Sequence, residues 1–251
     1  IDESHSVRVA ENLYVSNDYK YAIVDTIINS KLGEKKYKYS DVGFYFIPKI
    51  VEMVTNTPFE KYISDNFYKP LGVNNIFFKP LDHVDISKIV PTEDDKVFRK
   101  QLLRGDVDDQ AAALLGGVAG HAGLFANATD LAVMMQFLLN DGSYNGKKMF
   151  SSSTIRKFTS APFANNDNFH GIGFNKLNRA AGIKHNTASL KASDSSFGHT
   201  GFTGTFVWAD PENQLVVVFL SNRVHPDADN NKLVELDIRT KIHDLFYDAV
   251  R

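Results

Sequence analysis

The sequence predicts an α+β fold in which a helical cluster stands beside an antiparallel sheet that is backed by a C-terminal helix. Three observations support this prediction. Helical spacing of apolar residues dominates the first part of the chain, two apolar runs at 206–210 and 215–220 flank a short polar turn, and an amphipathic stretch covers 232–250. Helices first and an antiparallel sheet afterwards are typical of α+β proteins.

Composition excludes several classes of function. The 251 residues are 43% hydrophobic and 23% charged, which is ordinary for a globular protein. A net charge of −2 offers no basic surface for nucleic acid, and the lack of cysteine excludes disulfides, zinc–thiolate sites and a cysteine nucleophile. No apolar run is long enough to span a membrane. The chain starts at Ile1 with no signal-peptide pattern, so we expect it to begin inside a longer gene product.

Three helices are predicted before residue 73, over 21–29, 42–57 and 59–68. Ser40 or Asp41 can cap the second helix, whose apolar residues recur at helical spacing, and Pro58 ends it. Residues 73–110 show no clear periodicity, and we expect them to cover a site rather than to build the core.

The middle of the chain changes in composition at residues 111–124, which are glycine-rich and carry no Asp, Glu, Lys or Arg. This run predicts close packing of backbone against backbone, with His121 as a buried, hydrogen-bonded histidine rather than a ligand. Asn127 and Asp130 resemble a capping box before a helix that ends near residue 139. A helix over 151–158 that serine caps, a strand over 169–174 and a polar loop over 175–196 complete this region.

The stretch Phe197–Thr205 carries the first candidate chemistry. His199 lies among glycines, at the predicted start of an inner strand of the sheet, where a ligand can approach the backbone closely. Backbone N–H groups of Gly201 and Phe202 offer an oxyanion site at the strand edge. The alternative is a glycine-rich strand start whose histidine is only structural.

Tyr39 is the second candidate. It precedes a predicted helix, whose positive end favours the phenolate form that a general base needs. The alternative for Tyr39 is a boundary tyrosine that packs on the core, and Asp41 is most simply a helix cap. No histidine or carboxylate cluster has the spacing of a metal site, and Gly116–Gly120 lacks the Lys-Ser/Thr end of a phosphate-binding loop, so no cofactor is expected.

Three segments in a fixed order carry a resemblance. Tyr39-Ser40-Asp41 opens an apolar helix, residues 117–125 precede a capped helix, and His199-Thr200-Gly201 opens a strand. This order, over nearly all of residues 21–250, resembles the serine β-lactamase and penicillin-binding-protein superfamily in its class C, esterase and D-aminopeptidase-like branch. The likeness is greatest to the β-lactamase-like module that follows a family 3 glycosidase in some bacterial proteins.

The resemblance implies a β-lactamase/transpeptidase-like fold and acyl transfer through a serine nucleophile. In such a protein the serine of a Ser-x-x-Lys motif attacks a carbonyl, and Tyr39 helps to move its proton. Asp41 stands where the family often has Asn. Its carboxylate would add charge next to the motif's lysine. His199 replaces the Lys of Lys-Thr-Gly and offers less positive charge to a carboxylate.

The resemblance also assigns the neighbours of His199. Phe202 would donate the second oxyanion N–H, Gly201 belongs to the same catalytic set, and Thr200 and Thr203 would bind substrate. The chain is then a single domain without its N-terminal portion, with a mainly helical region at 1–160 and the sheet and final helix at 161–251.

The nucleophile itself is not in the sequence. No serine is followed three residues later by lysine, and Ser153 is followed by Arg156 at that spacing. We therefore expect the nucleophile and its lysine before residue 1, in a missing N-terminal segment that acts as a partner of this chain. Without that segment, the sheet is expected to expose an apolar edge that invites self-association.

Two functions from different classes follow. The first is part of a bacterial hydrolase for an ester, amide or peptidoglycan-type acyl bond, which is periplasmic or otherwise exported. The second is a catalytically inactive module that binds cell-wall peptide or supports an attached glycosidase. An α+β domain without enzymatic activity is a third, weaker alternative.

Overall fold

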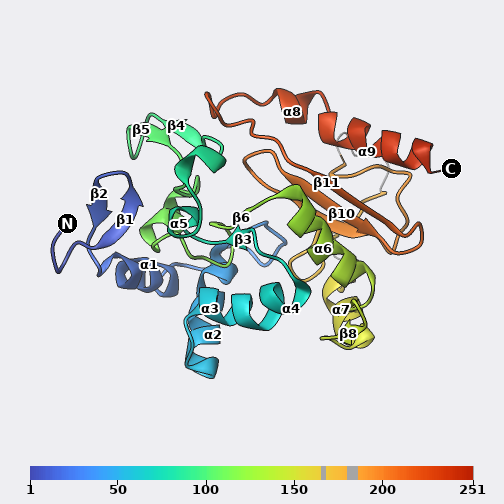
Figure 1. The fold of residues 1–251 in the computed structure, drawn as a ribbon, viewed down its shortest axis with the longest axis horizontal. Helices are drawn as coiled ribbons and strands as arrows, with labels where there is room; N and C mark the ends of the chain where they lie inside the picture. Colours follow the sequence, from blue (N-terminus) through green and yellow to red (C-terminus); the bar gives the residue numbers. More distant parts are fainter. Residues whose placement is uncertain (165–167, 180–185, 251) are drawn as a thin grey trace. The chain divides into compact units, whose positions relative to one another are not determined.

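A computed structural model describes residues 1–164, 168–179 and 186–250 of the chain (Figure 1). The backbone divides into two compact units, and each is described by itself. The first unit comprises Ile1–Ala126 with Val224–Ala228, and the second comprises Asn127–Arg223 with the residues from Asp229 onward.

The first unit consists of short helices and two-stranded pairings. Its elements are β1 (Val7–Ala10), β2 (Leu13–Val15), α1 (Tyr19–Ile28), η1 (Val42–Phe46), α2 (Ile47–Thr55), α3 (Phe59–Ile63), η2 (Ser64–Tyr68), α4 (Lys69–Leu71), β3 (Ile76–Phe77), η3 (Pro80–Asp82), η4 (Ile86–Lys88), β4 (Glu93–Asp95), β5 (Gln101–Leu103), α5 (Gln110–Leu114) and β6 (Phe125–Ala126). The three predicted helices are present, but the second begins as the 3-10 turn η1, and the third is divided into α3, η2 and α4.

The core of the first unit disproves one prediction. Residues 73–110 do not merely cover a site, because they contribute several buried apolar side chains, namely Val73, Ile76, Phe78, Leu103 and Val107. Val107 packs with Val9 of β1 and with Ala112 of α5. Each short segment in this region buries only one or two side chains, so it leaves no periodic pattern to read.

The glycine-rich run packs backbone on backbone, as the sequence predicts. A side chain at Gly120 would overlap the carbonyl oxygen of Phe44 in η1, and one at Gly123 would overlap the carbonyl oxygen of Gly117. Gly123 also has a φ of +107°, a backbone conformation that glycine adopts without strain. These close approaches fix the glycine-rich run against the turn that follows Tyr39-Ser40-Asp41.

The second unit holds the main sheet and the helices that cover it. Its elements are α6 (Ala128–Leu139), β7 (Ser143–Tyr144), β8 (Lys147–Lys148), α7 (Ser152–Thr159), β9 (Phe197–Thr200), β10 (Phe206–Asp210), β11 (Leu215–Phe219), α8 (Lys232–Glu235) and α9 (Ile238–Ala249). The predicted caps are confirmed. The Asn127 side chain accepts a hydrogen bond from the Asp130 N–H at 2.8 Å, and Ser151 Oγ accepts one from the Thr154 N–H at 3.1 Å.

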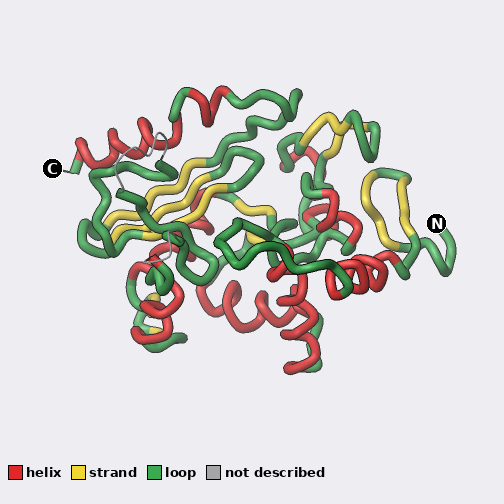
Figure 2. Tube along the Cα trace, turned by 180° about the vertical axis from the view of Figure 1, so that it is seen from behind, coloured by secondary structure: helices red, strands yellow, loops and turns green. Residues whose placement is uncertain are grey.

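The sheet is antiparallel in the order β11-β10-β9, and Figure 2 shows the three strands side by side from behind. Its two faces are covered by different helices. Tyr247 of α9 packs with Trp208 and Val217 on one face, and Met135 of α6 packs with Ala209 on the other. The predicted final helix therefore does back the sheet, although it is divided before Asp237, whose φ is +52°.

Two details of the predicted sheet are wrong. His199 does not start an inner strand. It lies near the end of β9, which, in the described part of the chain, pairs only with β10 in this sheet, and a glycine turn at 201–204 reverses the chain between the two strands. Residues 169–174 form no strand. Gly171 N–H donates to Phe174 O at 2.8 Å in a tight reversal, which leaves only isolated bridges at His170–Asn175 and Asn175–Gly198.

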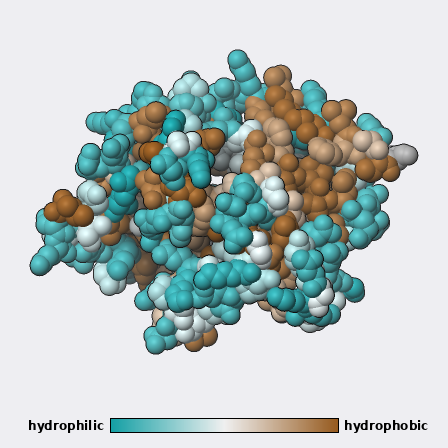
Figure 3. All heavy atoms as spheres, in the orientation of Figure 1, coloured by the Kyte–Doolittle hydropathy of each residue, from teal (hydrophilic) through white to brown (hydrophobic). Residues whose placement is uncertain are grey.

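The surface of the second unit carries exposed apolar side chains. Figure 3 shows them gathered over α9 and the neighbouring strand β11. Exposed apolar residues in or next to these two elements include Leu220, Leu236, Leu245, Phe246 and Val250. Of the predicted loop over 175–196, residues 180–185 lie outside the described part of the chain. No helix in the described residues is both long and apolar enough to cross a membrane.

Candidate functional site

The predicted site residues are distributed over both units. Tyr39 and Asp41 belong to the first unit, and the segment from His199 to Thr203 belongs to the second. The structure brings together the residues within each group. The family resemblance also implies that Tyr39 and His199 face one cleft, and this stays a prediction.

Tyr39 and Asp41 flank the start of η1. Asp41 occupies the N-cap position, but its carboxylate makes no capping hydrogen bond. Ser40 Oγ instead accepts the Val42 N–H at 3.3 Å, and the Asp41 carboxylate is hydrogen-bonded to the Tyr39 phenol. The predicted capping role of Asp41 is therefore wrong, and its side chain acts on Tyr39.

The charge state of Tyr39 also differs from the prediction. Partial burial, followed by the nearby negative charge of Asp41, raises the pKa of Tyr39 above its usual value. The positive helix end expected to favour a phenolate is only the five-residue 3-10 turn η1. With the Asp41 carboxylate beside it, Tyr39 is a neutral phenol that donates a hydrogen bond.

A second set of polar side chains packs behind this turn. The imidazole of His121 stacks on Tyr45 at 4.2 Å between ring centroids, and its Nε2 lies 3.0 Å from Asp109 Oδ1. The His121 side chain is only 2% exposed, so the predicted buried, hydrogen-bonded histidine is confirmed. Burial alone raises the pKa of Asp109, but hydrogen bonds from His121 and from the Ala112 N–H outweigh it and leave the pKa below its usual value.

In the second unit, His199 is half-buried near the end of β9. Its Nδ1 lies 2.8 Å from the carbonyl oxygen of Thr200. A carbonyl oxygen only accepts hydrogen bonds, so Nδ1 carries the proton and Nε2 is the nitrogen left to meet a ligand. Thr200 pairs with Phe206 of β10, which places it in the sheet just before the turn.

The turn after Thr200 decides which backbone N–H groups are available. The Gly201 N–H donates to the Thr205 carbonyl at 2.9 Å, so it does not serve as a free oxyanion donor, contrary to the prediction. Phe202 lies at the tip of the turn and is 68% exposed. Its N–H has no hydrogen-bond acceptor within the described residues. Phe202 is thus the predicted donor that the turn leaves available.

Sequence reasoning missed two arginines at this turn. Arg223 Nε donates to the Phe202 carbonyl at 2.9 Å, and its guanidinium lies 4.4 Å from the centre of the Phe202 ring. Arg239 Nη1 donates to the Thr205 carbonyl at 3.1 Å. These contacts join residues 21 and 34 positions apart in the sequence, so no local spacing indicates them.

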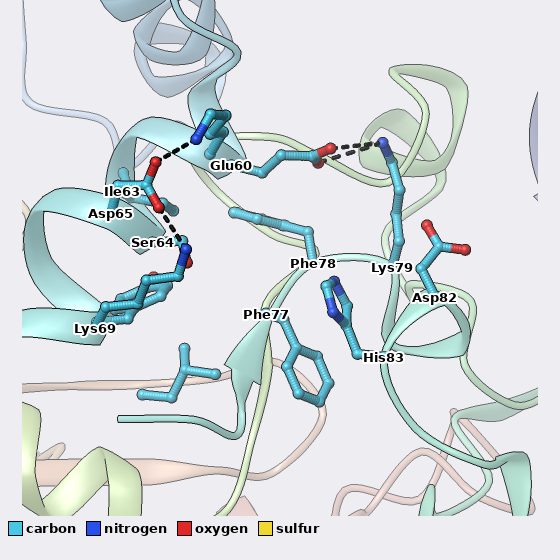
Figure 4. A pocket seen from close by; sticks show the side chains of 13 residues that line it. Glu60, Ile63, Ser64, Asp65, Lys69, Phe77, Phe78, Lys79, Asp82 and His83 are labelled. Carbon is cyan, nitrogen blue, oxygen red and sulfur yellow. Dashed lines mark hydrogen bonds and ion pairs between the residues drawn. The ribbon is translucent and has the colours of Figure 1, made fainter. Parts of the chain in front are cut away.

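A pocket of about 250 Å³ lies elsewhere in the first unit and is lined by side chains between Glu60 and His83 (Figure 4). Five of its charged side chains form ion pairs with one another. Lys79 meets Glu60, and Asp65 lies between Lys61 and Lys69. None of the predicted site residues lines this pocket. The described residues contain no group of three or more His, Asp or Glu side chains that could hold a metal ion.

Comparison with known proteins shows which family this chain belongs to. The family described as Beta-lactamase matches residues 4–240. The Escherichia coli (strain K12) protein named "Putative D-alanyl-D-alanine carboxypeptidase" is 37% identical over 210 residues, which cover 78% of this chain and 48% of that protein. This chain therefore spans about half the length of the curated relatives that it matches.

Solved structures share the fold at low identity. A β-lactamase from Mycobacterium bovis matches with a TM-score of 0.57 and 20% identity, over 86% of this chain and 65% of that one. A penicillin-binding protein homologue from Caulobacter crescentus matches with a TM-score of 0.52 and 15% identity, over 84% and 60% of the two chains. The α+β architecture that the sequence predicts is confirmed.

Proposed function

Because this chain belongs to the β-lactamase family, we propose that it forms the C-terminal part of a serine hydrolase whose nucleophile precedes residue 1. Two facts support this division of the active site. The chain contains no Ser-x-x-Lys motif, and it spans about half the length of its curated relatives. In this proposal, the preceding segment supplies the serine and the lysine, and this chain supplies the groups that surround them.

The proposed reaction is acyl transfer. The serine Oγ forms a bond to the substrate carbonyl carbon and passes its proton to the Tyr39 oxygen, while the Tyr39 proton moves on toward the leaving group. The bond to the leaving amine or alkoxide then breaks, and water hydrolyses the acyl-serine ester. The neutral phenol form of Tyr39 suits this proton relay better than it suits a general base, which would have to be a phenolate before the reaction begins.

The observation that carries the proposal is the N–H of Phe202. It lies at the tip of the turn after His199-Thr200-Gly201, without an acceptor among the described residues. An N–H with a fixed direction can donate to the oxygen that becomes negative when the serine attacks, and such a donor strongly stabilises the transition state.

The substrate class that we favour is a peptide with a D-alanyl-D-alanine terminus. The name of the Escherichia coli relative supports this choice. So does the local charge, because Arg223 and Arg239 lie at the turn and supply positive charge where His199 replaces the Lys of Lys-Thr-Gly. A peptide carboxylate close to the turn would be attracted by both guanidinium groups.

One observation favours the second function, an inactive module that binds cell-wall peptide. Asp41 stands where the family often has Asn, and its negative charge holds the Tyr39 proton more tightly. A site that has lost its relay would still bind a peptide. The residues encoded upstream decide between the two functions, because only the hydrolase requires both a serine and a lysine there.

The experiment uses the full-length gene product and its Tyr39→Phe variant. Each is incubated with a D-alanyl-D-alanine peptide, and both D-alanine release and peptide affinity are measured. The hydrolase is expected to release D-alanine, and the Tyr39→Phe variant to do so about 10²-fold more slowly with unchanged affinity. Binding without release by the unsubstituted protein would identify the binding module, and neither binding nor release would contradict both functions.

A further inference from the structure

The carbonyl groups of the turn between β9 and β10 are all held in place. The Gly201 oxygen accepts the Gly204 N–H at 3.1 Å and Arg239 Nη1 at 3.4 Å, and the Thr205 oxygen accepts the same Nη1 at 3.1 Å. Arg239 thus joins both ends of the turn. It lies in the first turn of α9, a helix packed on the sheet, so its guanidinium is fixed to a rigid element.

The tip of the turn is held by a second arginine. Arg223 Nε donates to the Phe202 oxygen at 2.9 Å, and the Arg223 backbone N–H donates to the Thr203 oxygen at 2.7 Å. Ser221 Oγ completes the set by donating to the Gly204 oxygen at 2.8 Å. Each peptide unit of the turn is therefore held through its oxygen.

The contacts of the Gly201 carbonyl also fix the direction of the Phe202 N–H. The unit between Gly201 and Phe202 is a planar trans peptide, since His225–Pro226 is the one cis bond found in the described residues. In a trans peptide, the carbonyl oxygen and the following N–H point in opposite directions. Holding the Gly201 oxygen therefore turns the Phe202 N–H to the opposite side of the turn.

We infer that Arg239 and Arg223 are positioning residues, which orient the peptide units of this turn so that the Phe202 N–H faces an incoming oxyanion. The inference rests on the proposed function for its catalytic consequence, whereas the orientation itself concerns this turn alone. The two guanidinium groups also contribute a positive field, because arginine keeps its charge even when it is partly buried. Burial and the neighbouring Arg223 do lower the pKa of Arg239.

The chain offers a matched control in the same unit. Arg179 also bonds two backbone carbonyls, those of Leu190 and Ala192, and pairs with Asp194. Its loss removes a comparable set of contacts but touches no atom of the turn. If the loss of any arginine that hydrogen-bonds backbone carbonyls lowers activity, Arg179→Met will lower it as Arg239→Met does.

The test measures kcat and KM of the full-length protein on the D-alanyl-D-alanine peptide for Arg239→Met, Arg239→Lys and Arg179→Met. Arg239→Met is expected to lower kcat by about 10²-fold with KM nearly unchanged, because an oxyanion donor acts mainly in the transition state. Arg239→Lys should recover part of the loss, and Arg179→Met should keep kcat within about twofold. An unchanged kcat in Arg239→Met, or an equal loss in Arg179→Met, would overturn the inference.

A second measurement separates this inference from the proposed function. In isotope-labelled full-length protein, the carbonyl ¹³C of Gly201 and the amide ¹⁵N of Phe202 report the orientation of the peptide unit. Arg239→Met and Arg239→Lys should shift both signals, whereas Arg179→Met should leave them in place. If the protein proves inactive, these shifts still support the positioning role, and unshifted signals in a folded Arg239→Lys variant refute it.

Discussion

Nε2 of His121 lies 3.0 Å from Oδ1 of Asp109, and the same carboxylate oxygen accepts the Ala112 N–H at 2.7 Å. One side chain therefore caps α5 and also holds an imidazole that is stacked on Tyr45. The glycine-rich run is thus attached to the turn at Tyr39 from two sides, by this stack and by the close approach of Gly120 to the Phe44 carbonyl.

This double role predicts an unusually large loss of stability in Asp109→Ala. The loss of a cap alone amounts to about 1 kcal/mol, and a hydrogen bond to a charged group contributes about 1.5–3 kcal/mol. Urea unfolding of Asp109→Ala should therefore show a larger loss than Ser151→Ala, which removes a cap from α7 and two exposed hydroxyl contacts, with Ser153 and Thr154. Asp109→Asn, which can still cap, should fall between them.

The pH dependence of this effect has a definite sign. The pKa of Asp109 is lower in the folded chain than in the unfolded chain. Its stabilising contribution is therefore complete above the unfolded value and is lost as the pH falls through the folded value. Equal losses in Asp109→Ala and Ser151→Ala at neutral pH would show that the contact with His121 adds nothing.

The second prediction concerns the charge that Asp41 places beside Tyr39. Asp41→Asn removes that charge, so the pKa of Tyr39 should fall toward its usual value, although burial, the larger cause of the shift, is kept. Titration of the tyrosine Cζ signals by NMR, assigned with Tyr39→Phe, measures the change. Ser40→Ala serves as the control and should leave the titration in place, and an unchanged titration in Asp41→Asn would contradict the pairing.

The sequence predicts best those features of the fold and the site that depend on residues close together in the chain. Helices and caps follow from local spacing, so the capped starts of α6 and α7 were predicted correctly. The position of His199 in β9 was missed because a glycine turn, not a strand, follows it. Arg223 and Arg239 were missed because their partners lie far away in sequence, where no periodicity connects them.

The electrostatic prediction at Tyr39 failed for a different reason, because it depended on the direction of a neighbouring side chain. The helix after Tyr39 was expected to favour the phenolate, but its first turn is a short 3-10 segment and the nearest charge is the negative Asp41. The sequence shows both residues, yet only the structure shows that the Asp41 side chain points to Tyr39 instead of capping the helix. The family motif was recognisable because it depends on order along the chain.

The third prediction is a fall in stability with rising pH that is caused by Glu93. Burial, followed by a hydrogen bond and charge repulsion from Asp108, raises the pKa of Glu93 from 4.5 to about 8. Between these values the folded chain keeps a proton that the unfolded chain has lost, so the free energy of unfolding decreases as the pH rises. This contribution is complete below the unfolded value and is lost by about pH 8.

Glu93→Gln tests this assignment because it removes the titrating group and keeps the shape of the side chain. Urea unfolding at several values between pH 5 and pH 8 should show the variant gaining stability relative to the unsubstituted chain as the pH rises. Asp94→Asn is the control, because Asp94 lies next in the strand and pairs with Lys96 near the surface. Parallel pH profiles for Glu93→Gln and the unsubstituted chain would rule out the raised pKa.

The last prediction is self-association through the edge of the main sheet. β11 has β10 on one side and no strand partner on the other among the described residues, and unpaired edge groups are available to a second chain. Leu220 follows β11 and Leu245 belongs to α9, and both are exposed apolar side chains. In sedimentation velocity over a range of concentrations, the 251-residue chain should form dimers.

Leu220→Lys and Leu245→Lys should weaken that dimer by about tenfold or more each, because a charge next to the strand edge or in the exposed apolar surface opposes its burial against a second chain. Leu32→Lys provides the matched control, since Leu32 is 98% exposed and lies in the first unit. An equal effect of Leu32→Lys would assign the association to general hydrophobicity. A chain that stays monomeric at every concentration would show that this edge does not drive self-association.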